Sequence, residues 1–588
     1  MVGRLAAAGL LAALLCAAFP SVLFGGRTFS SAAWLPGALP TGPVGVAGPP
    51  DVAAPVRDLE GATWVDEPAP YLVHRGLAAG QAPLWNDAEG LGIPLLGNPN
   101  MGALSPLQFL VNLFPSSGMQ DFAWLLRVFL LGFFTFGLAR ELGIRFASAL
   151  AAAVALMLSG QTVEWIEHHP LNTDVFVPAT LWAALALRRN GDRGIAWIAL
   201  AVSAGLLGVK PQSAIMAGVF GLSWLLADAA DRSSAAAEEG ADPDAMPLYR
   251  QIGGWVCGVA LGAGIAAIAL VPFAETYGQA SGLVRAGRTT QSQWTLPVGS
   301  LSSLGGSLAK ELQYVPTGGA TPPAEGTSRG LPYAGLTVIV GAALGFWHTR
   351  RSWLTRALAL TVVVEVLRIH GALPVPLGDV PIFGSINYVK YCFPLYLALA
   401  LLVARGLDSL PFPATLLGLV LVTAEMLWLV PRTWAERVDV YAPAPWTVEL
   451  QRLAEERPGR FSGPVELAPP LVSSAMGIRD LRSIDVLTPR DTYDFVSRLI
   501  SPSRGVTWIL ADPTPLLAAT GLGSNLADLR WIASAQPLRI EELPEAVRES
   551  TTSRRLVRLF GALDRQSIET RQLGGGLHDG GRDRRFHW

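Results

Sequence analysis

Apolar stretches long enough to cross a membrane recur along the 588 residues of this chain, and they constrain its fold more than any other feature. Hydrophobic residues make up 51% of the chain and charged residues only 15%, which argues against a soluble enzyme, a disordered protein or a fibre. The net charge of −2 gives no indication of a nucleic-acid partner. The three cysteines have neither metal-ligand nor disulfide spacing. The composition therefore predicts a polytopic membrane protein.

Eleven apolar segments are predicted to form membrane helices, although several are shorter than a full span. They are residues 5–25, 119–139, 146–161, 170–187, 194–209, 212–229, 252–272, 332–348, 354–369, 390–405 and 412–430. We interpret the first segment as an uncleaved anchor rather than a signal peptide, because its apolar core is long for a signal peptide.

The distribution of arginine predicts how these helices are oriented. If the N-terminus is cytoplasmic, the basic residues of the short loops fall inside, as the positive-inside bias requires. They are Arg4, Arg140, Arg145, Arg188, Arg189, Arg193, Arg350, Arg351, Arg356 and Arg405. An odd number of helices then places the C-terminus outside, so that most of the non-membrane mass lies on the outer face.

The predicted architecture is an all-α polytopic membrane bundle with a C-terminal extracytoplasmic α/β domain. The bundle covers residues 1–430 and includes two long outer loops, 26–118 and 273–331. Mixed helical and strand-like patterns predict the α/β domain over 431–573. The Gly- and Arg-rich end, 574–588, is predicted to be disordered.

The first outer loop carries adjacent carboxylates, Asp66 and Glu67, followed closely by two prolines, Pro68 and Pro70. A carboxylate on such stiff backbone at the mouth of a membrane bundle can act as a general base on a hydroxyl. The alternative is that the pair is an ordinary solvated feature of the loop.

Further motifs follow Asp66 in the same loop. The chain reads Gly80-Gln-Ala-Pro-Leu-Trp85-Asn86, then Gly92-Ile-Pro-Leu-Leu-Gly-Asn98-Pro99-Asn100, then Ser105-Pro106. This order resembles the first extracytoplasmic loop of YfhO-type bacterial membrane proteins, which belong to the GT-C class of polyprenyl-phosphate-sugar-dependent glycosyltransferases.

The resemblance continues along most of the chain. The segment from Leu270 to Glu275, followed by Ser281 and Arg285, resembles the family's Pro-x-x-Glu, Ser and Arg positions. The later segments that resemble the family are Tyr333-Ala-Gly335, Ala404-Arg-Gly-Leu-Asp408 and Gly477-Ile-Arg-Asp480.

Two departures from the family concern basic residues. Lys210, followed by Gln212, stands where the family often has histidine, and Lys390 stands near the position of a family arginine. Both lysines fall at predicted outer helix ends, against the positive-inside bias. They either extend to the membrane interface without further consequence or bind a lipid-linked phosphate.

The segment 162–174 concentrates polar groups, with Glu164, Glu167, His168, His169 and Asn172. Two acids and two histidines can bind a divalent metal, but adjacent histidines are expected to project in different directions, which disfavours joint ligation. Contact with a substrate and a plain polar loop are the other interpretations. The sequence does not require a metal or any other cofactor.

The resemblance implies a glycosyltransferase of the bacterial inner membrane. Its donor would be a polyprenyl-phosphate-linked sugar lying in the bilayer, its acceptor a hydroxyl of a cell-envelope glycan or polymer, and its outcome inversion. Asp66 or Glu67 would be the catalytic base, with Asp58 a more distant alternative. The candidate substrate-binding residues are Trp85, Asn86, Asn98, Asn100, His168, His169, Asn172, Lys210, Gln212, Glu275, Arg285 and Lys390.

Two other classes of function remain open from the sequence. A transporter or lipid flippase of envelope precursors would use charges inside membrane helices, for which Glu365 and Glu425 are candidates. Glu365 and Arg368 are spaced to pair on one helix face, whereas Glu425 has no evident local partner. Paired, broken halves typical of transporters are not found in the sequence. A non-catalytic assembly protein is the third class.

Overall fold

The computed structural model describes most of the predicted bundle and short pieces of the region after it. The described residues are 2–33, 61–90, 92–208, 210–239, 246–280, 304–305, 331–372, 392–437, 439, 441, 448, 451–452, 459–462, 470–480, 483 and 530–533. The candidates Asp58, Arg285 and Lys390, most of the predicted α/β domain and the predicted disordered end lie outside these residues.

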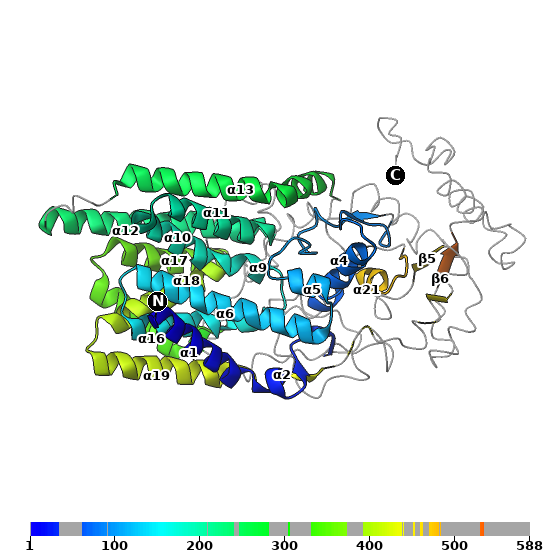
Figure 1. The fold of residues 1–588 in the computed structure, drawn as a ribbon. Helices are drawn as coiled ribbons and strands as arrows, with labels where there is room; N and C mark the ends of the chain where they lie inside the picture. The colour runs from blue at the N-terminus through cyan, green and yellow to red at the C-terminus, as the bar shows by residue number, and fades with distance from the viewer. Residues whose placement is uncertain are drawn as a thin grey trace, which may run out of the picture.

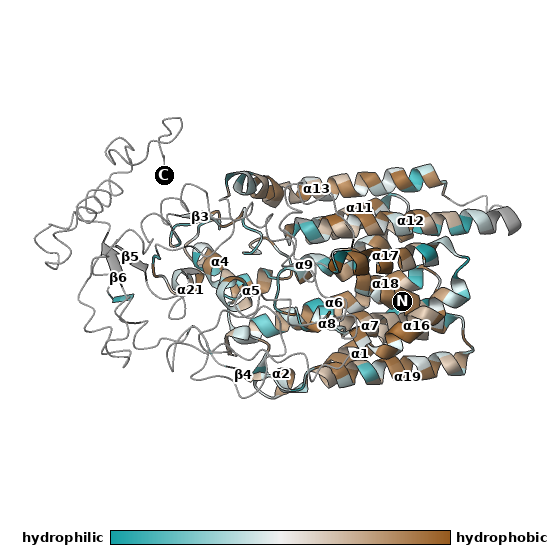
Figure 2. Ribbon diagram, turned by 180° about the vertical axis from the view of Figure 1, so that it is seen from behind, coloured by the Kyte–Doolittle hydropathy of each residue, from teal (hydrophilic) through white to brown (hydrophobic). Residues whose placement is uncertain are grey.

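Long helices pack side by side in a bundle whose residues are largely hydrophobic (Figures 1 and 2). Each of the eleven apolar segments of the sequence contains a helix. They are α1 (Val2–Ala18), α6 (Ser117–Glu141), α7 (Phe146–Met157), α10 (Phe176–Asn190), α11 (Asp192–Leu207), α12 (Pro211–Glu239), α13 (Leu248–Gln279), α16 (Leu336–Thr349), α17 (Trp353–Ile369), α18 (Phe393–Asp408) and α19 (Phe412–Leu429).

Four of the described helices, α6, α12, α13 and α19, are long and apolar enough to cross a membrane. The chain is therefore a multi-pass membrane protein. The total number of spans and the side on which each end lies stay predictions.

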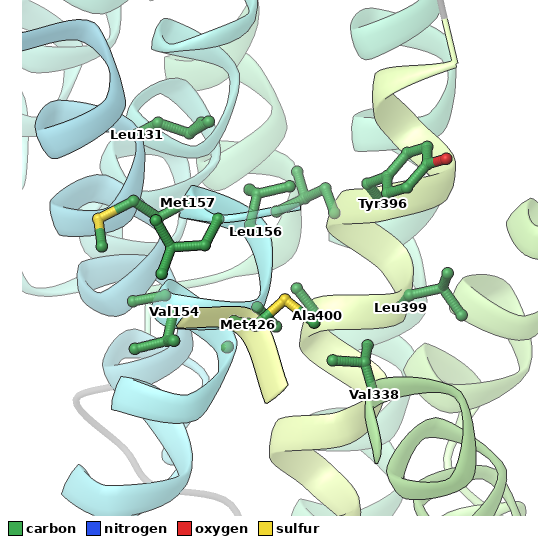
Figure 3. Packing of buried hydrophobic residues seen from close by; sticks show 14 of the residues in the cluster. Leu131, Val154, Leu156, Met157, Val338, Tyr396, Leu399, Ala400 and Met426 are labelled. Atoms are coloured by element: carbon green, nitrogen blue, oxygen red, sulfur yellow. The ribbon is translucent and has the colours of Figure 1, made fainter. Parts of the chain in front are cut away.

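Helices α7 and α18 occupy the centre of the bundle, where nearly all their side chains are buried. The small residues of α7 and α18 allow their neighbours to approach closely. A Cβ at Gly345 of α16 would collide with the carbonyl oxygen of Leu402 in α18, so the two backbones touch. Figure 3 shows the resulting core, in which α6, α7, α16, α18 and α19 contribute Leu131, Val154, Leu156, Met157, Val338, Tyr396, Leu399, Ala400 and Met426.

Two half-buried carboxylates cap neighbouring helices. Glu425 of α19 accepts hydrogen bonds from the backbone N–H groups of Leu336 (2.7 Å) and Thr337 (2.8 Å), at the start of α16. Asp231 of α12 accepts from Trp353 (2.6 Å) and Leu354 (3.0 Å), at the start of α17. Each satisfies donors that a helix N-terminus leaves without intrahelical partners.

These contacts bear on the transporter alternative. Glu425 lacks a local partner in the sequence, and the structure supplies one from another helix. Glu365 pairs with Arg368 at 2.6 Å, as their spacing predicts. Both candidate transport charges therefore have structural roles.

The chain reverses direction at each turn of the bundle, which gives the bundle two distinct ends. The arginine end contains the turns between α6 and α7, α10 and α11, α16 and α17, and α18 and α19. An ion pair between Arg145 and Asp408 (2.9 Å) joins two of these turns, and Arg189 pairs with Glu141 at the α6 and α10 ends. The basic residues of the predicted cytoplasmic loops thus gather at one end.

The opposite end, called the loop end here, carries the short elements (Figure 1). They are α2 (Pro20–Phe24), η1 (Ser31–Ala33), the π-helical turn η2 (Ala62–Asp66), α4 (Ala69–Ala78), α5 (Phe109–Leu113), α8 (Gly160–Val163), α9 (Pro170–Asp174) and α21 (Pro470–Ala475). Three two-stranded antiparallel pairs accompany them: β1 (Arg27–Thr28) with β4 (Ala435–Glu436), β2 (Trp85–Asn86) with β3 (Ile93–Pro94), and β5 (Gly459–Ser462) with β6 (Arg530–Ala533).

The described part of the region after α19 packs onto the first loop. Leu471 of α21 lies in one apolar cluster with Leu72 and Val73 of α4. The backbone N–H of Asp480 donates to the carbonyl of Ala88 at 2.6 Å. The first loop and residues 470–480 therefore form one layer over the loop end.

Candidate functional site

Asp66, at the last position of η2, lies between two histidines. Its Oδ2 is 2.9 Å from Nδ1 of His168, and its Oδ1 is 2.9 Å from Nδ1 of His169. Both histidine side chains are 1% exposed and that of Asp66 is 9% exposed. The expectation that adjacent histidines diverge is therefore wrong here. Residues 164–169 form consecutive turns, so the two rings reach one carboxylate.

The hydrogen bond at Nε2 of His169 determines which of the two ring nitrogens carries the proton. Nε2 of Gln108 lies 2.6 Å from Nε2 of His169, and Nδ2 of Asn172 donates to Oε1 of Gln108 at 3.1 Å. An amide nitrogen only donates, so Nε2 of His169 must accept. The ring proton of a neutral His169 is then on Nδ1, where it faces Asp66.

The electrostatics agree with this arrangement. Burial by itself raises the pKa of the Asp66 carboxyl, but His169 and His168 outweigh burial and hold that pKa well below its ordinary value. Burial lowers the pKa of His169 against the attraction of Asp66, and the positive charges of Lys210 and Arg127 lower it further. Asp66 is thus ionised and His169 neutral near pH 7.

Lys210 lies close to this group, between α11 and α12. Its Nζ donates to Oδ1 of Asn100 at 2.6 Å, and the backbone N–H of Asn100 donates to Oδ1 of Asn98 at 2.9 Å. Lys210 is 7% exposed, and its charge acts on His169. The Asp66 cluster, as we name it, comprises Asp66, Asn98, Asn100, Gln108, Arg127, His168, His169, Asn172 and Lys210.

Two of these residues were not predicted from the sequence. Arg127 of α6 is fully buried and donates from Nη1 to the backbone carbonyl of His168 at 3.0 Å. Its place inside an apolar segment was the signal that could have identified it. Gln108 follows Ser105-Pro106 by two residues, and nothing in the sequence distinguishes it from other loop amides.

Glu67 lies in different surroundings from Asp66. Both of its carboxylate oxygens accept from the hydroxyl of Ser30, at 2.9 and 2.8 Å. Glu167, the residue before His168, accepts from the backbone N–H (2.9 Å) and hydroxyl (2.8 Å) of Ser31. Burial raises the pKa of Glu67 to about 7 and raises that of Glu167 well above its ordinary value. Glu67 and Glu167 therefore bind the segment Arg27–Ala33, whereas Asp66 binds the histidines.

The remaining described candidates lie apart from the Asp66 cluster. Trp85 is 51% exposed, and Oδ1 of the buried Asn86 accepts from the backbone N–H of Ala88 at 3.1 Å. Glu275 is exposed on α13 and Gln212 is half-buried at the start of α12. Among the described residues, none of these four side chains has a hydrogen bond or ion pair to the cluster.

The part of the chain that the structure describes contains no group of three or more histidine, cysteine, aspartate or glutamate side chains arranged to hold a metal ion. The 2.9 Å separations within the Asp66 cluster are those of hydrogen-bonding partners.

Partial similarity to known proteins is found among solved structures. No family model matches the chain, and no curated protein matches it. Among solved structures, the chain is similar to the oligosaccharyltransferase of Archaeoglobus fulgidus in its crystal structure with zinc and sulfate, at 11% sequence identity and a TM-score of 0.35. The similarity covers 77% of this chain and 55% of that chain, so this chain spans about half the length of the archaeal enzyme.

Proposed function

We propose that this protein is a GT-C-type glycosyltransferase of the bacterial inner membrane. It transfers a sugar from a polyprenyl-phosphate donor in the bilayer to a hydroxyl of an envelope glycan or polymer on the outer face. The observation that carries the proposal is the Asp66 cluster, in which an ionised carboxylate is held by two histidines at the loop end of a membrane bundle. The resemblance of the first-loop motifs to YfhO-type proteins supplies the donor and acceptor classes.

Asp66 acts as the general base. As the acceptor oxygen attacks the anomeric carbon, its proton passes to Asp66, and the bond between that carbon and the phosphate oxygen breaks. Attack and departure on opposite sides invert the configuration, and polyprenyl phosphate leaves. Because the pKa of Asp66 is held low, it is a weak base, so proton transfer must accompany formation of the new bond.

The other polar residues bind the reacting groups. Lys210 neutralises charge on the departing phosphate, together with Arg285 and Lys390 from outside the described residues. Sugar hydroxyls bind to residues of the cluster that offer amide or imidazole groups, namely Asn98, Asn100, His168 and Asn172. In this proposal the loop end faces outward and the N-terminus is cytoplasmic, as the arginine distribution predicts.

The substitution Asp66→Asn tests this proposal. We expect release of polyprenyl phosphate from a panel of polyprenyl-phosphate hexoses, measured in proteoliposomes, to fall by about 10³-fold, because the base is lost. Insertion and thermal stability should persist. Asp408→Asn is the matched control, since it removes an acid of the arginine end and should leave the transfer rate within about twofold.

The double variant with Asp66→Asn and Glu67→Gln removes both candidate bases. If sugar transfer survives in this double variant, the protein is not a carboxylate-dependent glycosyltransferase and the proposal fails.

A further inference from the structure

Arg127 is the largest fully buried side chain among the described residues, and it lies near the middle of α6. Burying a guanidinium in a membrane bundle costs free energy that a partner must offset. The one hydrogen bond recorded for this side chain runs from Nη1 to the carbonyl of His168. That carbonyl belongs to the turn that presents both histidines to Asp66.

Two other buried or half-buried arginines each pair with a carboxylate. Arg368 pairs with Glu365 at 2.6 Å, and Arg437 pairs with Asp121 at 3.1 Å. Within the described part of the chain, Arg127 has no carboxylate at ion-pair distance, and its Nε and Nη2 have no hydrogen-bond partner. In arginine–carboxylate ion pairs, two neighbouring guanidinium nitrogens such as these often donate in parallel to the two carboxylate oxygens. The charge of Arg127 is therefore not neutralised by a direct partner.

The charges that Arg127 does act on belong to the site. Among charged groups, Asp66 has the largest electrostatic effect on Arg127 and Glu167 the second largest. His168 and His169 from the turn contact Asp66, Arg127 of α6 interacts with Asp66 electrostatically, and Lys210 interacts electrostatically with His169. Because His169 is neutral in the arrangement above, Arg127 is a permanent positive charge that interacts with the carboxylate of Asp66.

We propose that Arg127 is a positioning residue, which fixes the turn carrying His168 and His169 through the His168 carbonyl and keeps the Asp66 carboxylate ionised through its unpaired charge. The proposal rests on the function proposed above only for its activity readout. It assigns Arg127 no contact with the donor or the acceptor.

The test uses the full-length protein in lipid nanodiscs with Arg127→Met, which retains bulk, and Arg127→Lys, which retains charge. Isotope-edited infrared spectroscopy, with the Asp66 band assigned from Asp66→Asn, measures the protonation of that carboxylate between pH 3 and 8. We expect protonation of Asp66 in Arg127→Met to begin about one to three pH units above that in the wild type. Arg127→Lys should remain within about half a unit of the wild type.

Activity supplies the second readout. The acid limb of kcat/KM for sugar transfer should move to higher pH in Arg127→Met by the same amount as the infrared midpoint. Arg127→Lys should keep the wild-type limb but lose about tenfold in kcat at similar KM, since the hydrogen bond to the turn is displaced. Arg437→Met is the matched control, because it removes an arginine whose partner is Asp121 and should leave the Asp66 midpoint unchanged.

An unmoved Asp66 midpoint in Arg127→Met would overturn the proposal, whether or not sugar transfer is detected. If Arg127→Met does not fold, a midpoint in Arg127→Lys displaced by more than one unit would overturn it equally. If the wild type shows no sugar transfer, the proposed function is wrong. The infrared result then tests the role of Arg127 by itself.

Discussion

The two ends of the bundle differ in how their charged side chains are arranged. At the arginine end several charges form direct ion pairs, as Arg145 does with Asp408 (2.9 Å) and Arg232 with Asp228 (2.7 Å). At the loop end Glu67, Asp121 and Glu167 are buried, and repulsion among them adds to the rise in the pKa of Glu67 and Glu167. A charge paired singly near the surface holds turns together, whereas charges concentrated in a dry site perturb one another. This comparison supports our proposal that chemistry takes place at the loop end, while the ion pairs of the arginine end support the structure.

The loop end also shows how its perturbed acids are arranged. Three carboxylates hold the segment Arg27–Ala33: Asp121 accepts from the hydroxyl of Thr28 at 3.0 Å, and Glu67 and Glu167 accept from the two serines that follow it. Glu67 is the neighbour of Asp66 in the chain, and Glu167 is the neighbour of His168. The segment therefore joins the two turns whose side chains meet at Asp66.

The largest expected effect concerns Glu67, a buried acid of the loop end. Its pKa is raised to about 7 from 4.5, so the folded state binds the proton more tightly than the unfolded state. The resulting stabilisation is present below pH 4.5 and is lost as the pH rises through about 7. We expect the wild type to lose about 3 kcal/mol over this window relative to Glu67→Gln.

Unfolding in detergent across a pH series measures this difference. Ser30→Ala should increase it, because the hydroxyl of Ser30 lowers the pKa of Glu67. Parallel stability curves for the wild type and Glu67→Gln would show that Glu67 does not carry the raised pKa.

The next effect concerns the hydrogen bond between His169 and Asp66. His169→Phe removes the Nδ1 donor, and we expect sugar transfer to fall about 100-fold because the carboxylate loses its orientation. His169→Asn should recover part of the rate, since its amide can donate from a similar position. Arg189→Met at the arginine end is the control and should remain within about twofold. Equal rates for the Phe and Asn variants would indicate that His169 acts only by filling space.

How much of this was predictable differs between the fold and the site. The positions of the helices follow from apolar runs, because burial in lipid or in the bundle requires continuous apolar residues. Asp66, His168 and His169 were each singled out by residue type. Their convergence was not predicted, since it depends on the turns over 164–169 and on contacts between widely separated segments.

The residues that sequence reasoning missed are single polar side chains without a local pattern. Arg127 acts through a backbone carbonyl, and Gln108 acts through the far nitrogen of a histidine. Neither contact produces a recognisable spacing of residues in the sequence. Asp66 and Glu67 are adjacent in the sequence but contact different partners. The sequence does not predict this difference, because it depends on the backbone conformation of η2.

The smallest expected effect tests whether a half-buried charge outside the Asp66 cluster is purely structural. Glu425 caps α16 from α19, and replacing it by Gln removes the negative charge at a helix N-terminus and one strong acceptor. Losing such a cap costs about 1–2 kcal/mol, so Glu425→Gln should lower thermal stability and leave sugar transfer within about twofold. The amide keeps one oxygen, which distinguishes this change from Glu425→Ala, where the loss should be larger. A transporter that used Glu425 would instead lose its activity at unchanged stability, and that result would restore the alternative that the helix caps now disfavour.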